Sequence, residues 1–246
     1  MLLAHRRQQQ SGFTPGRSTC DRILTLNLIA QRRREFGRPT YAAYVDLRSA
    51  FDLMSQPALW ILLSRLGIPS KIIHLIKSLY EQSVSCVRAN GLQSEWFKIT
   101  SGVRQGCVVA PDSFATGVDW VMERATGRGM NGVVFGQDAY TDLDFADDIS
   151  LLEEFLIPVL EAFAEEAAAI GLEVNWNKTK VQALGTHQLQ LDWDTESLDV
   201  YRHQVAVVDE FIYLGALTHS SVLSCYDIHR RSGLTRSAMQ ISDNCL

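Results

Sequence analysis

The chain has 246 residues, of which 46% are hydrophobic and 21% are charged, and its formal net charge is −5. A chain of this size and composition can bury the core of one or two globular domains. The opening residues Met1 to Ala4 run directly into His5, Arg6 and Arg7, and no later apolar run approaches the length of a membrane span. These features argue against a signal peptide and a membrane helix. We therefore expect an intracellular protein, in either the nucleus or the cytoplasm.

The cysteines also exclude two classes of protein. They are odd in number, widely spaced and free of any Cys-x-x-Cys pair: Cys20, Cys86, Cys107, Cys225 and Cys245. This pattern argues against a disulfide framework and against a zinc knuckle.

Charge is distributed unevenly along the chain. Residues 1–40 hold eight arginines and only two acidic residues, a balance of +6, and the remaining residues carry −11. A basic arm joined to an acidic body is typical of a protein that binds a polyanion beside a metal site. A solvated helix face explains the same charge equally well.

Glycine and proline between residues 10 and 19 predict a loop, and Ser18 or Thr19 can cap the helix that follows. That helix ends in three arginines, at positions 32–34, which either complement the helix dipole or contact phosphate. Arg17 lies in the glycine-rich loop at the helix start, where a guanidinium is well placed to recognise phosphate.

The short apolar run over residues 41–47 predicts a buried strand with Asp46 near its end. A buried carboxylate is costly unless it is paired or bound to a metal. Two packing helices are predicted next, over about 57–66 and 69–80, the first beginning at a proline.

A hairpin is predicted over residues 84–99, with Asn90-Gly91 as its turn. It leads into a sharp loop in which Gly102 and Gly106 flank Arg104 and Gln105. Glycine allows the backbone to approach a ligand closely, and the two polar side chains can donate hydrogen bonds to phosphate, sugar or base. A plain turn is the alternative. A helical stretch to residue 124 follows.

Residues 142–152 read Asp-Leu-Asp-Phe-Ala-Asp-Asp-Ile-Ser-Leu-Leu, which predicts two short strands with Asp147 and Asp148 in the tight turn between them. At an effective dielectric near 20, two charges about 4 Å apart repel by roughly 4 kcal/mol. A pair held near a third carboxylate therefore needs a cation, and Mg²⁺ suits carboxylate and phosphate oxygens. A solvated acidic turn is the alternative for an isolated pair. A phosphatase of the aspartyl-phosphate type is remote, because its pattern fails at Ala146.

Beyond the turn, an amphipathic helix is predicted with its apolar face in the core and its glutamates mostly solvated: Glu153, Glu154, Glu161, Glu165 and Glu166. A strand over 181–184, a strand and turn over 211–215, and a basic helix beginning near 228 complete the chain.

Six segments in a fixed order resemble the reverse transcriptase domain of non-LTR (LINE-type) retrotransposons. They are Gln10-x-Gly12-Phe13-x-x-Gly16-Arg17-Ser18-Thr19, Tyr44-Val45-Asp46-Leu47-x-x-Ala50-Phe51-Asp52, Gly102-Val103-Arg104-Gln105-Gly106-Cys107, Phe145-Ala146-Asp147-Asp148, Gly171-Leu172-x-x-Asn175-x-x-Lys178-Thr179 and Tyr213-Leu214-Gly215. Each segment is weak or moderate alone, but the ordered set spans residues 10–215.

The resemblance implies an α+β fold, the palm of a right-hand polymerase, in which an antiparallel sheet with packed helices carries the site. Residues 1–40 would be partial fingers, 41–217 the palm with an interleaved fingers segment at about 53–104, and 218–246 the start of the thumb. A finger segment of the Arg-Pro-Ile type and most of the thumb would lie outside the chain, as expected for a piece of a longer polyprotein.

By the same resemblance, the activity would be RNA-directed DNA synthesis from a dNTP onto a DNA primer along an RNA template. Two Mg²⁺ ions, with Mn²⁺ as a substitute, would be bound by Asp46, Asp147 and Asp148. Lys178 would protonate the leaving pyrophosphate, and Phe51 would exclude a ribose 2′-hydroxyl.

The remaining roles implied by the resemblance concern nucleic acid and nucleotide. Arg17, Arg104, Gln105 and Gly106 would contact template and nucleotide, and Tyr213, Leu214 and Gly215 would grip the primer. The alternative is a catalytically inactive remnant that at most binds nucleic acid. The sequence leaves the oligomeric state open.

Overall fold

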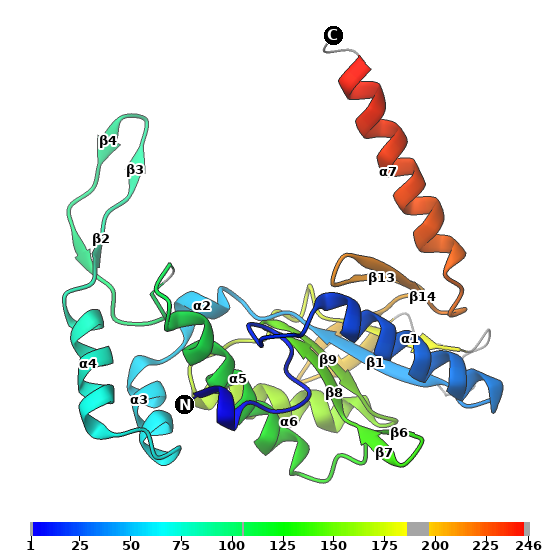
Figure 1. The fold of residues 1–246 in the computed structure, drawn as a ribbon, viewed down its shortest axis with the longest axis horizontal. Coiled ribbons are helices and arrows are strands. Elements are labelled where there is room, and N and C mark those ends of the chain that lie inside the picture. The colour runs from blue at the N-terminus through cyan, green and yellow to red at the C-terminus, as the bar shows by residue number, and fades with distance from the viewer. Residues whose placement is uncertain (1, 105, 186–196, 244–246) are drawn as a thin grey trace.

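A six-stranded sheet forms the centre of the computed structural model, which describes residues 2–104, 106–185 and 197–243. The strand order is β11-β12-β10-β1-β9-β8 (Figure 1). The strands are β1 (Thr40–Val45), β8 (Asp142–Phe145), β9 (Asp148–Leu152), β10 (Lys180–Leu184), β11 (Ser197–Val200) and β12 (His203–Val207). Strand β1 lies between β9 and β10 and is antiparallel to both, whereas β10 and β12 are parallel. The predicted α+β class is confirmed, but the sheet is mixed and not purely antiparallel as expected, because β12, which was not predicted, pairs in parallel with β10.

Strand β1 is buried on both faces, which explains why its sequence is a continuous apolar run. Tyr41, Ala43 and Val45 enter the larger of two hydrophobic cores, and Ala42 and Tyr44 enter the smaller one. The sheet therefore has a packed layer on each side, and the strand that leads to Asp46 is fixed from both.

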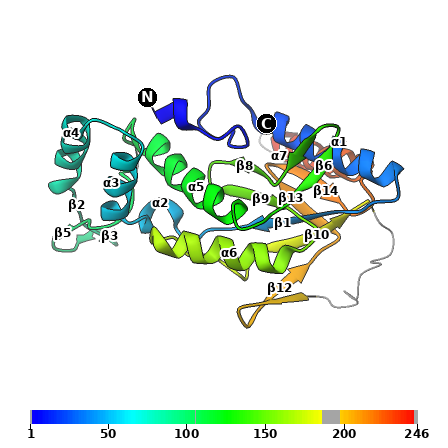
Figure 2. The same cartoon turned by 90° about the horizontal axis from the view of Figure 1, so that it is seen from below.

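Helices cover the two faces. Helices α5 (Ala110–Thr126) and α6 (Leu156–Ala169) pack side by side on one face (Figure 2). Helix α1 (Thr19–Glu35) packs on the other, with Leu26 and Ile29 fully buried. Its N-cap is Ser18, one of the two predicted candidates, and the Asp21 side chain accepts a hydrogen bond from the Ser18 N–H, which completes a capping box.

The segment between β1 and α5 lies at one end of the sheet (Figure 1). It contains α2 (Ala50–Leu53), α3 (Gln56–Arg65) and α4 (Ser70–Glu81), followed by a two-part hairpin in which β2 (Val84–Ser85) pairs with β5 (Phe97–Lys98) and β3 (Arg88–Ala89) pairs with β4 (Leu92–Gln93). Asn90 and Gly91 both have positive φ, 51° and 77°, so the predicted Asn-Gly turn is confirmed.

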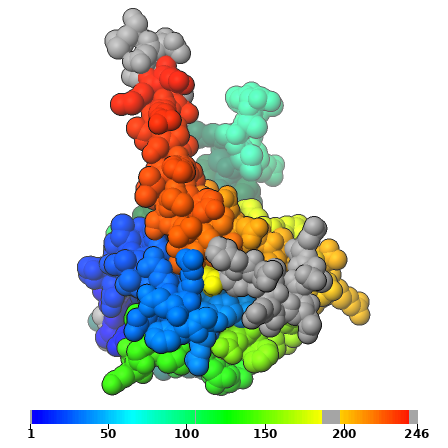
Figure 3. All heavy atoms as spheres, turned by 90° about the vertical axis from the view of Figure 1, so that its right-hand side faces the viewer, coloured from blue at the N-terminus to red at the C-terminus, as the bar shows by residue number. Residues whose placement is uncertain are grey.

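At the C-terminal end, β13 (Glu210–Tyr213) and β14 (Ala216–His219) form a hairpin, and α7 (Cys225–Asp243) rises from it, away from the body of the molecule (Figure 3). The guanidinium of Arg230 donates a 2.6 Å hydrogen bond to the Gly215 carbonyl, and Asp227 pairs with Arg230 and accepts from the Leu217 N–H. The turn of the β13–β14 hairpin therefore anchors the base of α7.

Several elements were not predicted from the sequence. They are the N-terminal 3₁₀ turn η1 (Leu2–His5), the hairpin of β6 (Val133–Phe135) and β7 (Asp138–Tyr140), the short helix α2, and strands β11, β12 and β14. These are short segments with weak periodicity, so pairing with neighbours decides their conformation. None of the described helices is long and apolar enough to span a membrane.

Two predictions about acidic residues were wrong in detail. The tight turn is made by Ala146 and Asp147, because Phe145 pairs with Asp148, the first residue of β9. Two of the glutamates expected to be solvated are buried. Glu153 precedes α6 and accepts from the N–H groups of residues 131 and 132, and Glu166 pairs with arginines of the neighbouring helical segment.

Candidate active site

Two adjacent strands bring the predicted acidic residues to the same end of the sheet. The register pairs Val45 with Ile149, so Asp46, directly after β1, lies beside Asp148, directly before Ile149. Asp147 occupies the turn between β8 and β9, and both Asp147 and Asp148 are exposed. The structure thus gathers carboxylates that are about 100 positions apart in the sequence.

The end of the sheet that carries Asp46, Asp147 and Asp148, called the acidic end below, has few positively charged side chains nearby among the described residues. The pKa of Asp148 is raised by partial burial, and further by the negative charges of Asp147 and Asp46. The buried Oδ2 atom of Asp46 has no hydrogen-bond partner, and the only described cation within ion-pair range of Asp46 is the Lys178 ammonium, 3.9 Å away. Among the described residues no three potential ligands are already arranged around a metal position.

A cavity of about 250 Å³ adjoins the acidic end. Its walls include Asp46, Asp148 and Lys178 on one side and Tyr213 and Leu214 of the β13–β14 hairpin on the other. The sequence segments expected to hold metal, protonate a leaving group and contact a primer therefore meet at one cavity.

The hairpin is fixed to the sheet by aromatic contacts. Phe211 stacks on Tyr44 with ring centroids 4.1 Å apart, and the buried Tyr213 hydroxyl donates a 2.7 Å hydrogen bond to the Leu143 carbonyl. The Tyr213 side chain is engaged in holding the hairpin, which leaves Leu214 and Gly215 as the turn beside the cavity.

Phe51 is held rigidly five residues after Asp46. Its ring stacks on the fully buried Phe114 at 4.2 Å and meets the edge of Phe13 at 6.5 Å. Helix α5 therefore fixes the orientation of a half-buried aromatic ring near the acidic end.

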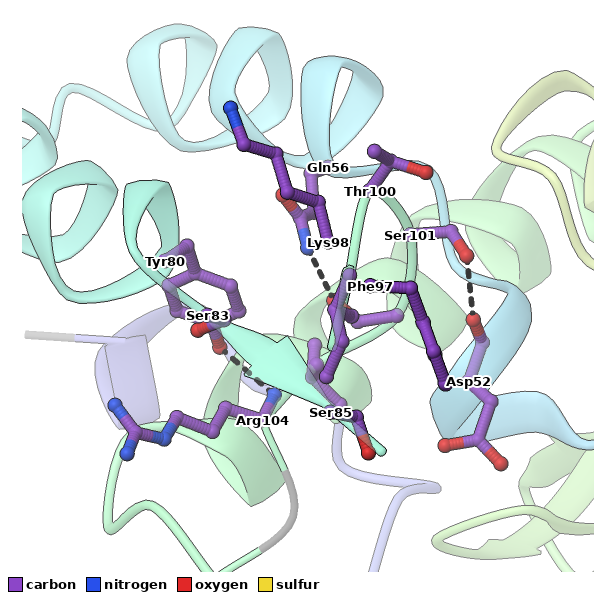
Figure 4. Close-up of a pocket in the computed structure, with 13 residues that line it drawn as sticks. Asp52, Gln56, Tyr80, Ser83, Ser85, Phe97, Lys98, Thr100, Ser101 and Arg104 are labelled. Carbon is purple, nitrogen blue, oxygen red and sulfur yellow. Dashed lines mark hydrogen bonds between the residues drawn. The ribbon is translucent and has the colours of Figure 1, made fainter. Parts of the chain in front are cut away.

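Arg104 lines a second, larger cavity of about 630 Å³ between α3, α4, the β2–β5 pair and residues 100–104 (Figure 4). The backbone N–H of Arg104 donates to the Tyr80 hydroxyl (3.3 Å), and Gln56 donates to the Gly102 carbonyl (3.1 Å), so this loop has a defined position. Gly106 is exposed, and Gln105 lies outside the described residues. Arg17 is exposed before the N-cap of α1 and lines neither cavity.

The basic N-terminal arm is not a free cationic surface. Arg6 pairs with Asp112 (3.0 Å) and Asp119 (3.3 Å), and Arg7 pairs with Asp142 (2.7 Å) and Asp144 (3.4 Å). Arg6 and Arg7, two of the eight arginines counted in residues 1–40, are therefore paired with carboxylates of the fold, three of which are buried; neither interpretation of the arm predicted this.

These ion pairs form a charge cluster of Arg6, Arg7, Asp112, Asp119, Asp142 and Asp144, of which Asp119, Asp142 and Asp144 are buried. Burial raises the pKa of Asp119 to about 7 despite the nearby Arg6. Burial and the adjacent Asp142 also raise the pKa of Asp144 well above its ordinary value. The sequence did offer one signal, because Asp142 and Asp144 alternate with Leu143 and so share one face of a strand.

A sheet that carries carboxylates at the ends of two neighbouring strands, with helices packed on both faces and a hairpin beside the acidic end, defines a palm-type nucleotidyl polymerase fold. The family model described as reverse transcriptase (RNA-dependent DNA polymerase) matches residues 2–217. The chain therefore belongs to the reverse transcriptase family. Members of this family use divalent metal ions and act on nucleic acids.

Curated relatives are retrotransposon proteins. The chain is 25% identical over 173 residues to the Pol polyprotein of the R2DM element of Drosophila melanogaster, covering 69% of this chain and 16% of that polyprotein. It is 28% identical over 174 residues to the R2 polyprotein of Popillia japonica (69% and 24%) and 24% identical to the RNA-directed DNA polymerase from the mobile element jockey of Drosophila funebris (82% and 22%). The chain thus spans a quarter or less of the length of these relatives.

Solved structures of similar fold include telomerases. That of Candida tropicalis, in complex with a fragment of telomeric RNA, has a TM-score of 0.58 at 16% identity, covering 89% of this chain and 36% of the telomerase. That of Candida albicans has a TM-score of 0.54 at 14% identity, covering 84% and 34%. The predicted family and the polymerase fold are both confirmed.

Proposed function

We propose that this chain performs RNA-directed DNA synthesis, transferring a nucleotide from a dNTP to the 3′-hydroxyl of a DNA primer paired with an RNA template. The observation that carries the proposal is the register of β1 and β9, which places Asp46 beside Asp148 and next to the turn residue Asp147. Family membership supplies the reaction class.

We assign Asp46, Asp147 and Asp148 to two Mg²⁺ ions, with Mn²⁺ as a substitute. The residues fit such ions, because the Asp46 Oδ2 atom is buried without a hydrogen-bond partner and the ionised form of Asp148 is disfavoured by partial burial and by its acidic neighbours. Bound metal ions would stabilise the attacking and leaving oxygens of an in-line displacement.

Other residues would act on substrate directly. Lys178 extends into solvent beside Asp46, with 70% of its side chain exposed, so its ammonium can reach and protonate a leaving pyrophosphate. Phe51, locked against Phe114, would exclude a ribose 2′-hydroxyl by its fixed position.

Template, primer and nucleotide would bind along the two cavities, the one beside Asp46 and the one lined by Arg104. Arg104, Gly106 and Gln105 would contact template and nucleotide, with Arg17 as a further phosphate contact. Leu214 and Gly215 would touch the primer, and Tyr213 would hold the turn that presents them.

The division of the chain follows from these assignments. We propose that residues 1–40 and about 53–104 are fingers, that the rest of 41–217 is palm, and that 218–246 begin the thumb. The exposed faces of α7 and of the 84–98 hairpin, which stand clear of the body, are consistent with this division.

Primer extension tests the proposal. The purified chain is incubated with an RNA template, a DNA primer, dNTPs and magnesium, beside Asp147→Asn and the matched control Asp138→Asn, an exposed aspartate of the neighbouring hairpin. We expect extension by wild type and Asp138→Asn and none by Asp147→Asn. Extension that persists unchanged in Asp147→Asn contradicts the site.

The same assay addresses the alternative of an inactive remnant that binds nucleic acid, which no observation on the described residues favours over the polymerase. A folded wild-type chain that binds template and primer, loses that binding as salt rises, and synthesises nothing would support the alternative, because phosphate contacts release counterions.

A further inference from the structure

Residues 9–12 lie along β8, one of the two edge strands of the described six-stranded sheet. Gln10 forms a parallel bridge with Asp144, the Ser11 N–H donates to the Asp144 carbonyl (2.9 Å), and the Asp144 N–H donates to the Gln9 carbonyl (3.1 Å). The N-terminal segment thus behaves as a short additional strand at the edge that leads into the acidic turn.

The Gln10 side chain extends from this segment to the turn itself. It is 1% exposed, and its Oε1 atom accepts hydrogen bonds from the N–H groups of Ala146 (2.8 Å) and Gly12 (2.7 Å). Its Nε2 atom donates a longer bond to the Ala146 carbonyl (3.4 Å). One buried amide therefore contacts both ends of the residue that immediately precedes Asp147.

Ala146 adopts a backbone conformation that residues other than glycine rarely take, with φ of 60°. Such a residue is held by its surroundings, because the conformation itself is unfavourable. Gly12 packs directly against it. A Cβ added to Gly12 would lie 2.1 Å from the Ala146 nitrogen, so only glycine permits this approach.

The segment that carries Gln10 is itself fixed from two sides. The Arg6 guanidinium donates to the Gly12 carbonyl (2.9 Å) while it pairs with aspartates of α5. From α1, the buried Arg22 donates to the Ser11 hydroxyl (2.6 Å) and to the Gln8 carbonyl (2.8 Å). Gln10 is therefore a rigid support for the turn.

We infer that Gln10 is a positioning residue for the metal-binding carboxylates: by fixing the Ala146 peptide, it sets the direction in which Asp147 and Asp148 leave the turn. The inference rests on the proposed function, since it assigns Gln10 to the same metal site. Support behind a ligand commonly affects metal affinity or activity by roughly 10- to 100-fold.

The decisive variant is Gln10→Met, which keeps the length of the side chain and removes its acceptor. Gln8→Met, the same change at an exposed position two residues earlier, is the matched control. Gln10→Asn keeps the amide but withdraws it by one methylene, and it gives a milder test where Gln10→Met does not fold.

Three quantities are measured on the full chain: Mn²⁺ affinity by electron paramagnetic resonance, hydrogen exchange of the Ala146 amide, and the magnesium dependence of extension. In Gln10→Met we expect Mn²⁺ affinity to fall by roughly 10- to 100-fold and the Ala146 amide to exchange faster. The magnesium concentration needed for half-maximal extension rises, while extension at saturating magnesium stays close to wild type. Gln8→Met matches wild type throughout.

A folded Gln10→Met or Gln10→Asn chain with wild-type Mn²⁺ affinity and wild-type exchange at Ala146 overturns the inference. So does a variant whose loss of extension is not relieved by added magnesium, because that result indicates general structural damage. A wild-type chain that binds Mn²⁺ but does not extend a primer contradicts the proposed function alone, and the effect of Gln10 on metal affinity is still measured.

Discussion

Two pairs of aspartates on one β-hairpin behave in opposite ways. Asp142 and Asp144, on β8, are completely buried and pair with Arg7. Asp147 and Asp148, a few residues further on, are exposed and have no arginine partner among the described residues. The first pair lies within the fold, and the second stands at its edge beside Asp46.

The difference separates carboxylates that are buried within the fold from those that we propose bind metal. Buried carboxylates are tolerated because arginines from the N-terminal segment compensate them. Exposed carboxylates gathered without such compensation are free to bind a cation. One acidic stretch therefore anchors the N-terminus at one end and provides the candidate metal ligands at the other.

The largest expected effect is the loss of stability when Arg7, the partner of the buried aspartates, is replaced. In Arg7→Met, the fully buried Asp142 and Asp144 lose their arginine partner, and we expect the free energy of unfolding to fall by roughly 3–5 kcal/mol. Urea unfolding measures it. The control is Arg32→Met, which removes the exposed Arg32–Glu35 pair and should cost less than about 1 kcal/mol. Equal losses in the two variants would contradict the separation.

Asp148→Asn should reduce activity without reducing stability, whereas Arg7→Met is expected to reduce stability. Extension should fall by at least ~100-fold, because a metal ligand supplies several kcal/mol of transition-state stabilisation. The free energy of unfolding without metal should stay the same or increase, because a carboxylate repelled by Asp147 and Asp46 is removed. A variant that loses stability in step with its activity would place Asp148 among the structural residues.

A third expected effect concerns pH. Burial raises the pKa of Asp119 to about 7, so between about pH 4 and pH 7 the folded chain binds this proton more tightly than the unfolded chain. Its contribution to stability is thus present at low pH and is lost as pH rises through 7, by up to ~1.4 kcal/mol per pH unit.

Asp119→Asn should reduce this slope in unfolding measured from pH 4 to 8. The slope is not abolished, because the buried Asp144 carboxyl, also with a raised pKa, acts in the same direction. A variant with the wild-type slope would show that Arg6 and Arg7 keep Asp119 ionised throughout this range.

Local signals predicted most of the elements of the fold. Helix α1 with its Ser18 cap, the Asn90-Gly91 turn, and the strands around Asp46 and Asp147 all follow from capping, turn chemistry and apolar patterning. The acidic residues of the candidate site were named from sequence because their segments occur in a fixed order.

The partners of the buried charged side chains could not be predicted from local sequence patterns. Arg7 and Asp142 are 135 positions apart, and no local pattern indicates that they meet. The same holds for Gln10 and Ala146, whose contact depends on the N-terminal segment lying along β8. Charge counting alone suggested a free basic arm because it carries no information on burial.

Mn²⁺ binding to wild type, Asp148→Asn and Asp144→Asn, followed by electron paramagnetic resonance, tests the separation of the two pairs most directly. We predict that Asp148→Asn weakens binding by at least ~10-fold, the lower bound for a supporting residue. Asp144→Asn, which replaces a buried carboxyl whose pKa is already raised, should bind as wild type does. Equal weakening in both variants, or no binding by the wild-type chain, would contradict the account.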